Sequence, residues 1–336
     1  MNGSEVFLAL LISSGLAAAG ESAVPMTGPG SVATLKFATL APDGSTWMRH
    51  LREMDRSVRE KSGGRLAFKF YPGGVSGDEK DVVSKMRIGQ LQAGGFTGLG
   101  LGEMAPEERV LETPFLTQDE SAAMRVADGL KPEIAAYMKK KGFVLLAWAH
   151  PGFAYFMTRE PVKDLAGLKK LKIWAWEGDP IAAALFDALG IAPIPLSLPD
   201  VLTSLQTGLI HGAYATPLAA IALQWHTQVR YFLQMPVAFV SGALVVTAAA
   251  YDKLPADLQK LLVDECEAAA VKLAAATRKE NIEAIAAIGQ SGVQIVAPPP
   301  DTRKPFEAAA MEARKKLSGT LFPAELLEKA ISLAGR

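Results

Sequence analysis

Apolar and polar positions alternate with two different periods in the first half of the chain, one typical of strands and one typical of helices. Residues 33–41 (ATLKFATLA) alternate with the period of a half-buried strand, and residues 46–64 place apolar side chains at helical spacing. The succession continues through a strand at 65–74, a helix at 77–90, a Gly-rich strand and loop at 91–100, a helix at 121–141 and a strand at 142–150. Strands that alternate with helices predict an α/β fold with largely parallel strands.

The same pattern restarts in the second half. The expected elements are strands near 154–160 and 169–176, a helix at 179–190, an extended segment at 191–197, a helix at 198–210, a strand-to-loop junction at 212–217, strands within 237–252, a long helix at 255–292 and a strand at 293–299. Two successive α/β units predict two lobes. Ligands of such folds bind at the carboxyl ends of strands or between domains, so we expect a cleft between the lobes.

The composition excludes several function classes. The 336 residues suit two domains, and equal numbers of basic and acidic side chains, 35 of each, argue against a nucleic-acid binder. The single cysteine, Cys266, excludes an intramolecular disulfide and a multi-cysteine metal site, and its Ala-rich surroundings predict a buried, inert thiol. The four histidines lack the spacing of a metal site.

Recognisable catalytic motifs are missing from the sequence. It contains neither G-x-S-x-G nor G-x-x-x-x-G-K-[ST], and the G-x-G-x-x-A match from Gly100 to Ala105 runs directly into Pro106, so we expect no phosphate loop there. The acidic run 77–81 is interpreted as the solvated first turn of a helix. These observations favour a binding protein over an enzyme, with no cofactor and no metal.

The N-terminus has the features of an export signal. Residues 6–20 (VFLALLISSGLAAAG) are apolar and then small, and residues 17–19 fit an A-x-A cleavage site, although the preceding MNGSE carries no basic residue. The run is too short to span a bilayer, which takes about 20 residues. We expect a signal peptide at 1–23, a flexible leader at 24–33 and a mature protein in the periplasm. An ordinary disordered N-terminus is the alternative.

Two of the five tryptophans, Trp174 and Trp176, stand two apart in LKIWAWEGD (171–179). On a strand, both rings point to the same face. A core strand and the wall of a binding pocket both explain this placement.

The order of segments resembles the DctP-type solute-binding proteins of TRAP transporters. The resemblance rests on stretches such as SGGRLAFKFYPGGVSGDEKDVVSKMRIGQLQAG, PVKDLAGLKKLKIW and LQTGLIHGAYATPLAAI, and it covers about residues 34–320. It implies a two-lobed periplasmic fold that closes over a ligand, a long helix spanning both lobes, and delivery of the ligand to TRAP permease membrane subunits. We place lobe I at 34–151 plus 242–282 and lobe II at 152–241 plus 283–330.

Three positions depart from the carboxylate-binding pattern that the resemblance implies. The family pattern has arginine at Trp174 and at Ala154, and asparagine at Thr216. In the family, the first arginine forms a bidentate pair with the ligand's carboxylate. We therefore expect an uncharged, hydrophobic or aromatic ligand. The alternative is an organic-acid binder with a relocated basic clamp, for which Arg159 and Lys172 are the candidates.

The expected ligand-binding residues gather where strands end at the cleft. They are Trp47, Thr97, Gly98, Phe153, Ala154, Tyr155, Trp174, Trp176, Tyr214, Thr216 and Pro217. Their aromatic rings would surround an apolar body, and the four hydroxyl side chains among them would orient a polar tip. The expected partners are the small-molecule ligand and the permease, and the chain itself is a monomer or a homodimer. An enzyme and a transporter-independent lipid carrier are the remaining alternatives.

Overall fold

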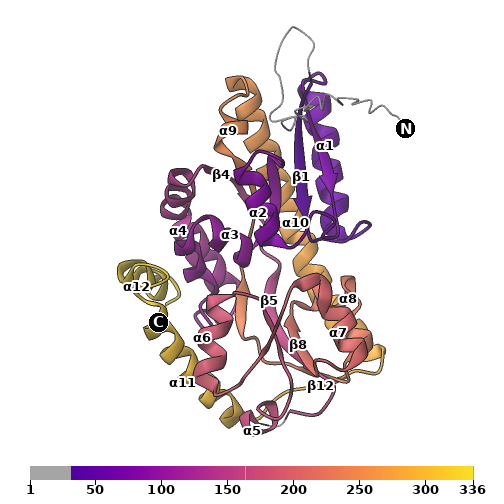
Figure 1. Cartoon of the computed structure of the whole chain (residues 1–336), viewed down its shortest axis with the longest axis vertical. Helices are drawn as coiled ribbons and strands as arrows, with labels where there is room; N and C mark the ends of the chain where they lie inside the picture. Colours follow the sequence, from indigo (N-terminus) through magenta and orange to yellow (C-terminus); the bar gives the residue numbers. More distant parts are fainter. Residues whose placement is uncertain (1–31, 163, 336) are drawn as a thin grey trace, which may run out of the picture.

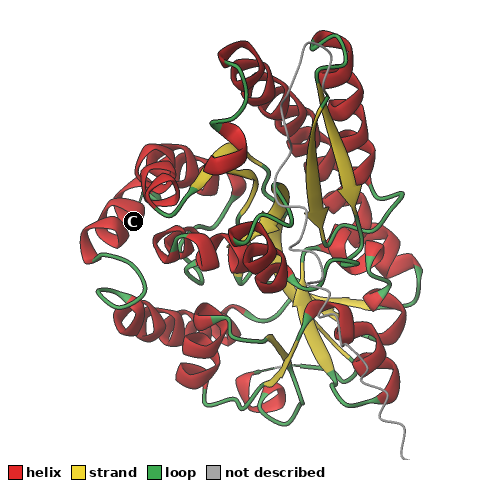
Figure 2. Cartoon of the chain, turned by 45° about the horizontal axis from the view of Figure 1, so that its top comes forward, coloured by secondary structure: helices red, strands yellow, loops and turns green. Residues whose placement is uncertain are grey.

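The computed structural model describes residues 32–162 and 164–335. The predicted signal peptide and most of the predicted leader lie outside these residues. The described part is an α/β fold of two lobes, each built around its own β-sheet, as the sequence predicts (Figure 1). Strands lie inside and helices surround them (Figure 2). None of the described helices combines the length and apolar character that crossing a membrane requires.

The first lobe is built on a five-stranded sheet. Its strands are β1 (Ala33–Thr39), β2 (Leu66–Tyr71), β3 (Ala93–Thr97), β4 (Phe143–Trp148) and β11 (Gly242–Thr247). Their order is β2-β1-β3-β11-β4, with β1 parallel to both of its neighbours and β11 antiparallel to both of its own. Every residue of β11 is buried, because its apolar run GALVVT is covered on both faces of the sheet.

Helices cover both faces of this sheet. On one face α1 (Thr46–Lys61) packs with α10 (Ala256–Gln290), and the sulfur atoms of Met54 and Cys266 lie 3.5 Å apart between them. Cys266 is 1% exposed, so it is buried as predicted. The other face is covered by α2 (Glu79–Arg87), α3 (Gly98–Met104), the 3-10 helix η1 (Pro106–Glu112) and α4 (Glu120–Lys140). The short helix α9 (Ala248–Tyr251) follows β11.

The sheet of the second lobe has β5 near its centre. Its strands are β5 (Gly152–Thr158), β8 (Gly212–Ala215), β9 (Tyr231–Leu233), β10 (Ala238–Val240) and β12 (Gln294–Val296). Strand β5 is antiparallel to β8, β9 and β10, whereas β12 is parallel to β9. The largely parallel arrangement expected from the sequence is therefore interrupted by β11 in one sheet and by β5 in the other. Both are strands on which the chain enters a lobe after crossing from the other lobe.

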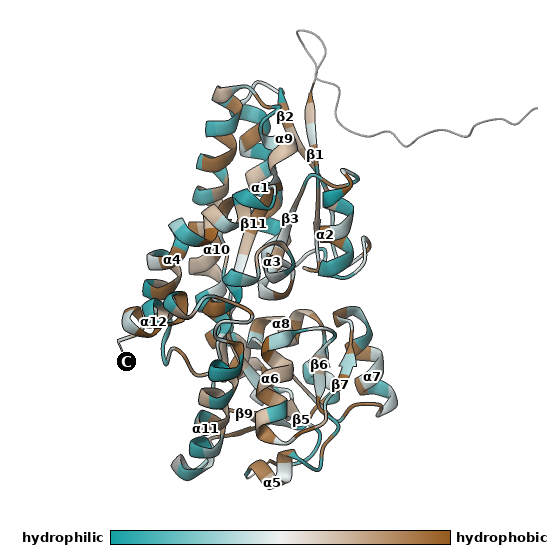
Figure 3. Ribbon diagram, turned by 60° about the vertical axis from the view of Figure 1, so that its left-hand side comes forward, coloured by the Kyte–Doolittle hydropathy of each residue, from teal (hydrophilic) through white to brown (hydrophobic). Residues whose placement is uncertain are grey.

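Short elements complete the second lobe. They are α5 (Leu165–Leu168), β6 (Trp174–Trp176), α6 (Pro180–Leu189), β7 (Ile194–Leu196), the 3-10 helix η2 (Leu198–Asp200), α7 (Val201–Thr207), α8 (Pro217–Ala222), the 3-10 helix η3 (Trp225–Gln228) and α11 (Pro300–Leu317). Strands β6 and β7 pair in parallel, and α11 lies beside α6 (Figure 3).

The long helix α10 spans both lobes, as the resemblance implied. It packs against α1 and β4 in the first lobe and against α8 in the second. The C-terminal helix α12 (Ala324–Leu333) packs against α4 (Figure 1). The residue boundaries expected between the lobes stay a prediction.

Two local expectations were wrong. Residues 98–100, the end of the expected strand and loop at 91–100, begin the helix α3 (Gly98–Met104). Glu79, in the acidic run interpreted as solvated, is 2% exposed, because its carboxyl group accepts hydrogen bonds from the backbone N–H groups of Thr97 and Gly100, both at 2.7 Å. A protein carboxyl group therefore occupies the N-terminus of α3, which agrees with the expectation that no phosphate loop exists there.

Candidate ligand-binding cleft

Three cavities lie where the lobes meet. The first, here called the aromatic cavity, has a volume of about 170 Å³ and is lined by Trp174, Trp176, Tyr214, Trp225, Phe156 and Phe186 together with residues of the first lobe. The second, the adjoining cavity, has about 270 Å³, shares Thr97, Trp176 and Thr216 with the aromatic cavity, and extends to Trp47. The third, the rear cavity, has about 200 Å³ and is lined by Phe153, Tyr155 and part of α10.

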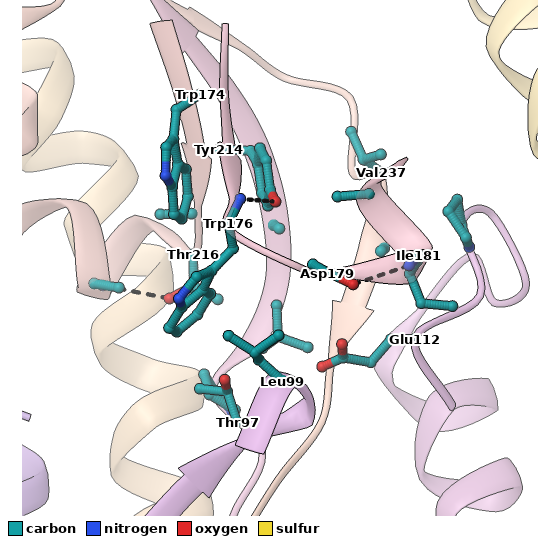
Figure 4. A pocket seen from close by; sticks show the side chains of 18 of the residues that line it. Thr97, Leu99, Glu112, Trp174, Trp176, Asp179, Ile181, Tyr214, Thr216 and Val237 are labelled. Carbon is teal, nitrogen blue, oxygen red and sulfur yellow. Dashed lines mark hydrogen bonds between the residues drawn. The ribbon is translucent and has the colours of Figure 1, made fainter. Parts of the chain in front are cut away.

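The tryptophan pair on β6 forms one wall of the aromatic cavity (Figure 4). The ring centroids of Trp174 and Trp176 lie 5.9 Å apart, and Trp174 also stacks on Tyr214 at 4.9 Å. Both indole N–H groups have acceptors: Trp174 donates to the backbone carbonyl of Leu196 at 3.0 Å, and Trp176 donates to the carboxylate of Asp78 at 2.8 Å. Trp174 is 1% exposed and buried against Tyr214, whereas Trp176 is only partly buried, so Trp176 is the more open of the two rings.

The structure brings most of the predicted site residues to these cavities. Six predicted residues line the aromatic cavity, namely Thr97, Ala154, Trp174, Trp176, Tyr214 and Thr216. Thr97, Trp176 and Thr216 also line the adjoining cavity, together with the predicted Trp47. Phe153, Tyr155 and Pro217 line the rear cavity instead. Because side chains alternate along β5, Phe153 and Tyr155 project to the face opposite Ala154. Their part in ligand binding stays a prediction.

Gly98 has a different place from the one expected. It does not line any of the three cavities, and a Cβ atom there would collide with the side chains of Arg109 and Glu112. The missing side chain at Gly98 therefore makes room for an ion pair against the start of α3.

That ion pair belongs to a charged group that the sequence did not single out. Arg109 and Glu112 lie on η1, and the Arg109 guanidinium contacts Glu112 of its own element and, at 2.6 Å, Asp179 of the second lobe. All three side chains line the aromatic cavity, and Arg109 is 2% exposed. The two carboxylates raise the pKa of Arg109 above its usual range against the opposing effect of burial. We call Arg109, Glu112 and Asp179 the ion triad.

The partners of the ion triad fix its geometry. Glu112 accepts hydrogen bonds from the backbone N–H and the hydroxyl of Ser241, at 2.7 and 2.9 Å, where the chain crosses between the lobes. Asp179 is the N-cap of α6, and its Oδ1 atom accepts the N–H of Ile181 at 2.9 Å. A lone arginine or glutamate gives no signal in sequence, but D-P at 179–180 is a helix-start pattern that marks Asp179.

Two further carboxyl groups lie buried in the first lobe near the ion triad. Burial raises the pKa of Glu79 to about 8 against the opposing effect of its backbone hydrogen bonds. Glu108 is fully buried, and burial and the charge of Glu112 raise its pKa. Within residues 32–162 and 164–335, no group of three or more His, Cys, Asp or Glu side chains is arranged to hold a metal ion.

Direct polar contacts join the two lobes beside the cavities. Asp78, the N-cap of α2 in the first lobe, accepts the indole N–H of Trp176 and the backbone N–H of Leu198 at 3.2 Å. With the Arg109–Asp179 pair, these contacts hold the lobes together over the cleft.

Comparison with known proteins identifies this arrangement. Residues 37–319 match the family model described as bacterial extracellular solute-binding protein, family 7 (DctP). The chain is 27% identical over 242 residues to the 2,3-diketo-L-gulonate-binding periplasmic protein YiaO of Escherichia coli K12, a match that covers 71% of this chain and 73% of YiaO.

Solved structures show the same fold. A TRAP periplasmic solute-binding protein of Pseudomonas putida F1 with bound D-glucuronate superposes with a TM-score of 0.82 at 25% identity, covering 88% of this chain and 96% of that one. DctP7 of Bordetella pertussis, a solute receptor binding pyroglutamic acid, gives 0.83 at 19% identity, covering 90% and 99%. These similarities confirm the prediction of a binding protein rather than an enzyme. The chain belongs to the DctP family of TRAP-type solute-binding proteins.

Proposed function

We propose that this protein is an exported receptor that captures a small molecule with an apolar or aromatic body and no carboxylate, and delivers it to a TRAP-type permease. The observation that carries the proposal is the aromatic wall of the cavity. Trp174 stands at the position that the family pattern gives to a carboxylate-binding arginine, buried on Tyr214 with 1% of its surface exposed, and the less buried Trp176 lies beside it. A cavity of about 150 Å³ with apolar walls holds a benzene ring. The aromatic cavity is of that size, at about 170 Å³.

The charges around the cavity also support this ligand class. Among the described residues that line the aromatic cavity, Arg109 is the single basic side chain, and it is already paired with Glu112 and Asp179. A buried carboxylate without a charged partner of its own costs several kcal/mol, on the order of what a tight complex gains from its best contacts. The aromatic cavity therefore disfavours an acid. The adjoining cavity has a basic side chain of its own, Arg49, which pairs with Glu280 at 3.7 Å.

The two basic residues that the sequence suggested as a relocated clamp do not provide a charged partner for a ligand carboxylate in these cavities. Arg159 donates to the backbone carbonyls of Leu205 and Gln228, and neither Arg159 nor Lys172 lines any of the three cavities. Their side chains are thus engaged elsewhere or lie away from the cleft.

A carboxylate receptor is the second candidate, because the similar proteins bind acids such as D-glucuronate and pyroglutamic acid. In that case Arg109 would be the relocated clamp. The ligand's carboxylate would have to displace Asp179 from the guanidinium and leave the Asp179 carboxylate without its ionic partner.

A thermal-unfolding panel separates the two candidates, since a ligand that binds the folded state alone raises the unfolding temperature. We expect neutral aromatic compounds to raise it and D-glucuronate and pyroglutamate to leave it unchanged. Trp174→Leu should abolish the shift, whereas Trp148→Leu, which removes an indole lining the rear cavity, should keep it. Stabilisation by the acids alone would reject the proposal.

Export, delivery and assembly complete the proposal. The family is periplasmic, and the apolar N-terminal run supports export through a signal peptide. We propose a monomer or a homodimer that presents the closed, ligand-bound form to the permease membrane subunits.

A further inference from the structure

The aromatic cavity has a polar edge that faces its tryptophans. Figure 4 shows Glu112 and Asp179 on the side of the cavity opposite Trp174 and Trp176. A ligand whose ring packs on the tryptophans therefore directs its polar end towards two carboxylates. The chemistry of those carboxylates defines which polar end fits.

The hydrogen-bond inventory of this edge leaves an acceptor open. Oδ1 of Asp179 accepts from Arg109 and Ile181, whereas Oδ2 receives no hydrogen bond within the described residues. Both oxygens of Glu112 already have donors, from Arg109 and Ser241, but each oxygen has a further lone pair. The one guanidinium at the edge uses a nitrogen for each carboxylate. The edge thus has acceptor capacity left for a donor group of the ligand.

The charge of this edge favours the same kind of ligand group as its open acceptors do. The ion triad combines one guanidinium and two carboxyl groups, and both carboxyl groups line the cavity. Burial raises the pKa of Glu112 against the opposing effect of Arg109, and a positive ligand group beside it favours its ionised form. A positive ligand group would neutralise the remaining charge, whereas a negative group would add to it in surroundings of low dielectric constant. Electrostatics therefore favours a cation at this edge.

The opposite wall also suits a cation. Trp174 packs against Tyr214 and, edge to face at 5.3 Å, against Trp225, so several aromatic side chains border one small volume. The electron-rich faces of tryptophan and tyrosine attract ammonium groups, and cages of such rings together with carboxylates recognise alkylated amines. Both indole N–H groups of the β6 pair are engaged in the protein, and Trp174 is buried against Tyr214, so the partly exposed rings of Trp176 and Tyr214 are the ones open to a ligand at this wall.

We propose that the polar end of the ligand is an amine, bound as its ammonium form between the Asp179–Glu112 edge and the aromatic wall. This inference rests on the proposed function, because it names the polar group of the same apolar or aromatic ligand, and it replaces the uncharged ligand expected from the sequence with a cationic one. It makes the receptor selective for a class of compound opposite in charge to the acids bound by the similar proteins of known structure.

Three probes that share one ring test the inference by isothermal titration calorimetry: 2-phenylethylamine, 2-phenylethanol and phenylacetate. We expect the amine to bind at least tenfold more tightly than the alcohol, and the acid not to bind. Asp179→Asn keeps an oxygen for Arg109 and for the N-cap but removes the charge, and it should reduce the advantage of the amine over the alcohol to less than threefold. Asp187→Asn is the matched control, since Asp187 lies on the same helix in an exposed pair with Lys316.

Each outcome decides a different point. An alcohol that binds as well as the amine, or an amine that does not bind, overturns the amine inference. Tight binding of the alcohol then still supports the proposed function. Binding of phenylacetate in preference to the other two overturns both. An unchanged preference for the amine in Asp179→Asn, with circular dichroism confirming the fold, removes the carboxylate edge as its cause.

Discussion

At the residue scale, we propose that the ligand class depends on Trp174 more than on any other residue. Trp174 is 1% exposed, stacks on Tyr214 and lines the aromatic cavity. An arginine there would direct a guanidinium into the same space, where carboxylates are bound bidentately. The choice between tryptophan and arginine thus decides whether this wall attracts an apolar face or an acid.

The variant Trp174→Arg should convert the receptor towards acids. We expect it to bind D-glucuronate at least tenfold more tightly than the wild type does, and to lose its stabilisation by neutral aromatic compounds. The buried charge lowers the stability of the ligand-free variant by a few kcal/mol, about the range for an unpaired buried ion. Calorimetry with both ligands measures the conversion.

A second variant controls for charge alone. Trp225→Arg adds the same charge at another position on the same cavity. Equal acid binding by both variants would show that position 174 has no special place in ligand selection.

Glu108 should make stability depend on pH. Its carboxyl group is fully buried, without a hydrogen bond within the described residues, and its pKa is raised above the usual value of 4.5. The folded state therefore keeps a proton that the unfolded state releases, so this contribution to stability is complete below pH 4.5 and is lost as the pH rises through the folded-state pKa.

The measurement is urea unfolding between pH 5 and 8. We expect the free energy of unfolding to fall with rising pH, by at most about 1.4 kcal/mol per pH unit from Glu108, and Glu108→Gln to reduce the slope by that contribution while Glu79 keeps its own. The exposed Glu60→Gln should leave the slope unchanged. A slope in Glu108→Gln as steep as in the wild type would mean that Glu108 does not keep the proton.

At the scale of elements, the long periodic segments were predictable and the cavity-forming pieces were not. Strand β1 and helices α1 and α10 follow their patterns because each buries one regular face. Helix α3 was missed because every second residue at the start of GLGLGEM is a glycine, which disfavours helix, and its N-terminus is stabilised by Glu79 from α2. Such tertiary stabilisation leaves no local pattern in the sequence.

In the candidate site, too, some residues were predictable from the sequence and others were not. Trp174, Tyr214 and Thr216 were predictable because they lie on motifs that can be aligned with a family. The ion triad was not, because Arg109 and Asp179 are 70 residues apart and meet only where η1 of one lobe approaches α6 of the other. Phe153 and Tyr155 line the rear cavity and Ala154 the aromatic cavity, because side chains alternate along a strand; the part of the two rings in ligand binding stays a prediction.

The contact between β6 and α2 should hold the lobes together. Trp176 donates its indole N–H to Asp78 across the cleft. Hydrogen bonds to a charged group contribute about 1.5–3 kcal/mol. Trp176→Phe keeps a ring on the cavity wall and removes the donor, so we expect a more open ligand-free protein and ligand affinity lower by about tenfold or more.

Small-angle X-ray scattering of the ligand-free protein measures the opening as a larger radius of gyration. Trp148→Phe serves as control, because its indole N–H has no partner within the described residues. An unchanged radius and affinity in Trp176→Phe would show that this hydrogen bond does not contribute to closure.

At the scale of the whole molecule, the arginine of the aromatic cavity is paired with carboxylates of the protein itself and not with a carboxylate of the ligand. Arg109 and Asp179 join the lobes, and Asp78 adds two hydrogen bonds from the other side of the cleft. We therefore propose that closure does not depend on an acidic ligand and that the ligand fills the aromatic cavity with a single ring system.

The most direct test of this account is native mass spectrometry of the protein purified without refolding, followed by solvent extraction of the bound molecule. The account predicts a co-purified compound with an apolar or aromatic body and no carboxylate, present in the wild type and in Trp148→Leu but lost in Trp174→Leu. A protein that instead carries a carboxylic acid, and keeps it in Trp174→Leu, would contradict the account.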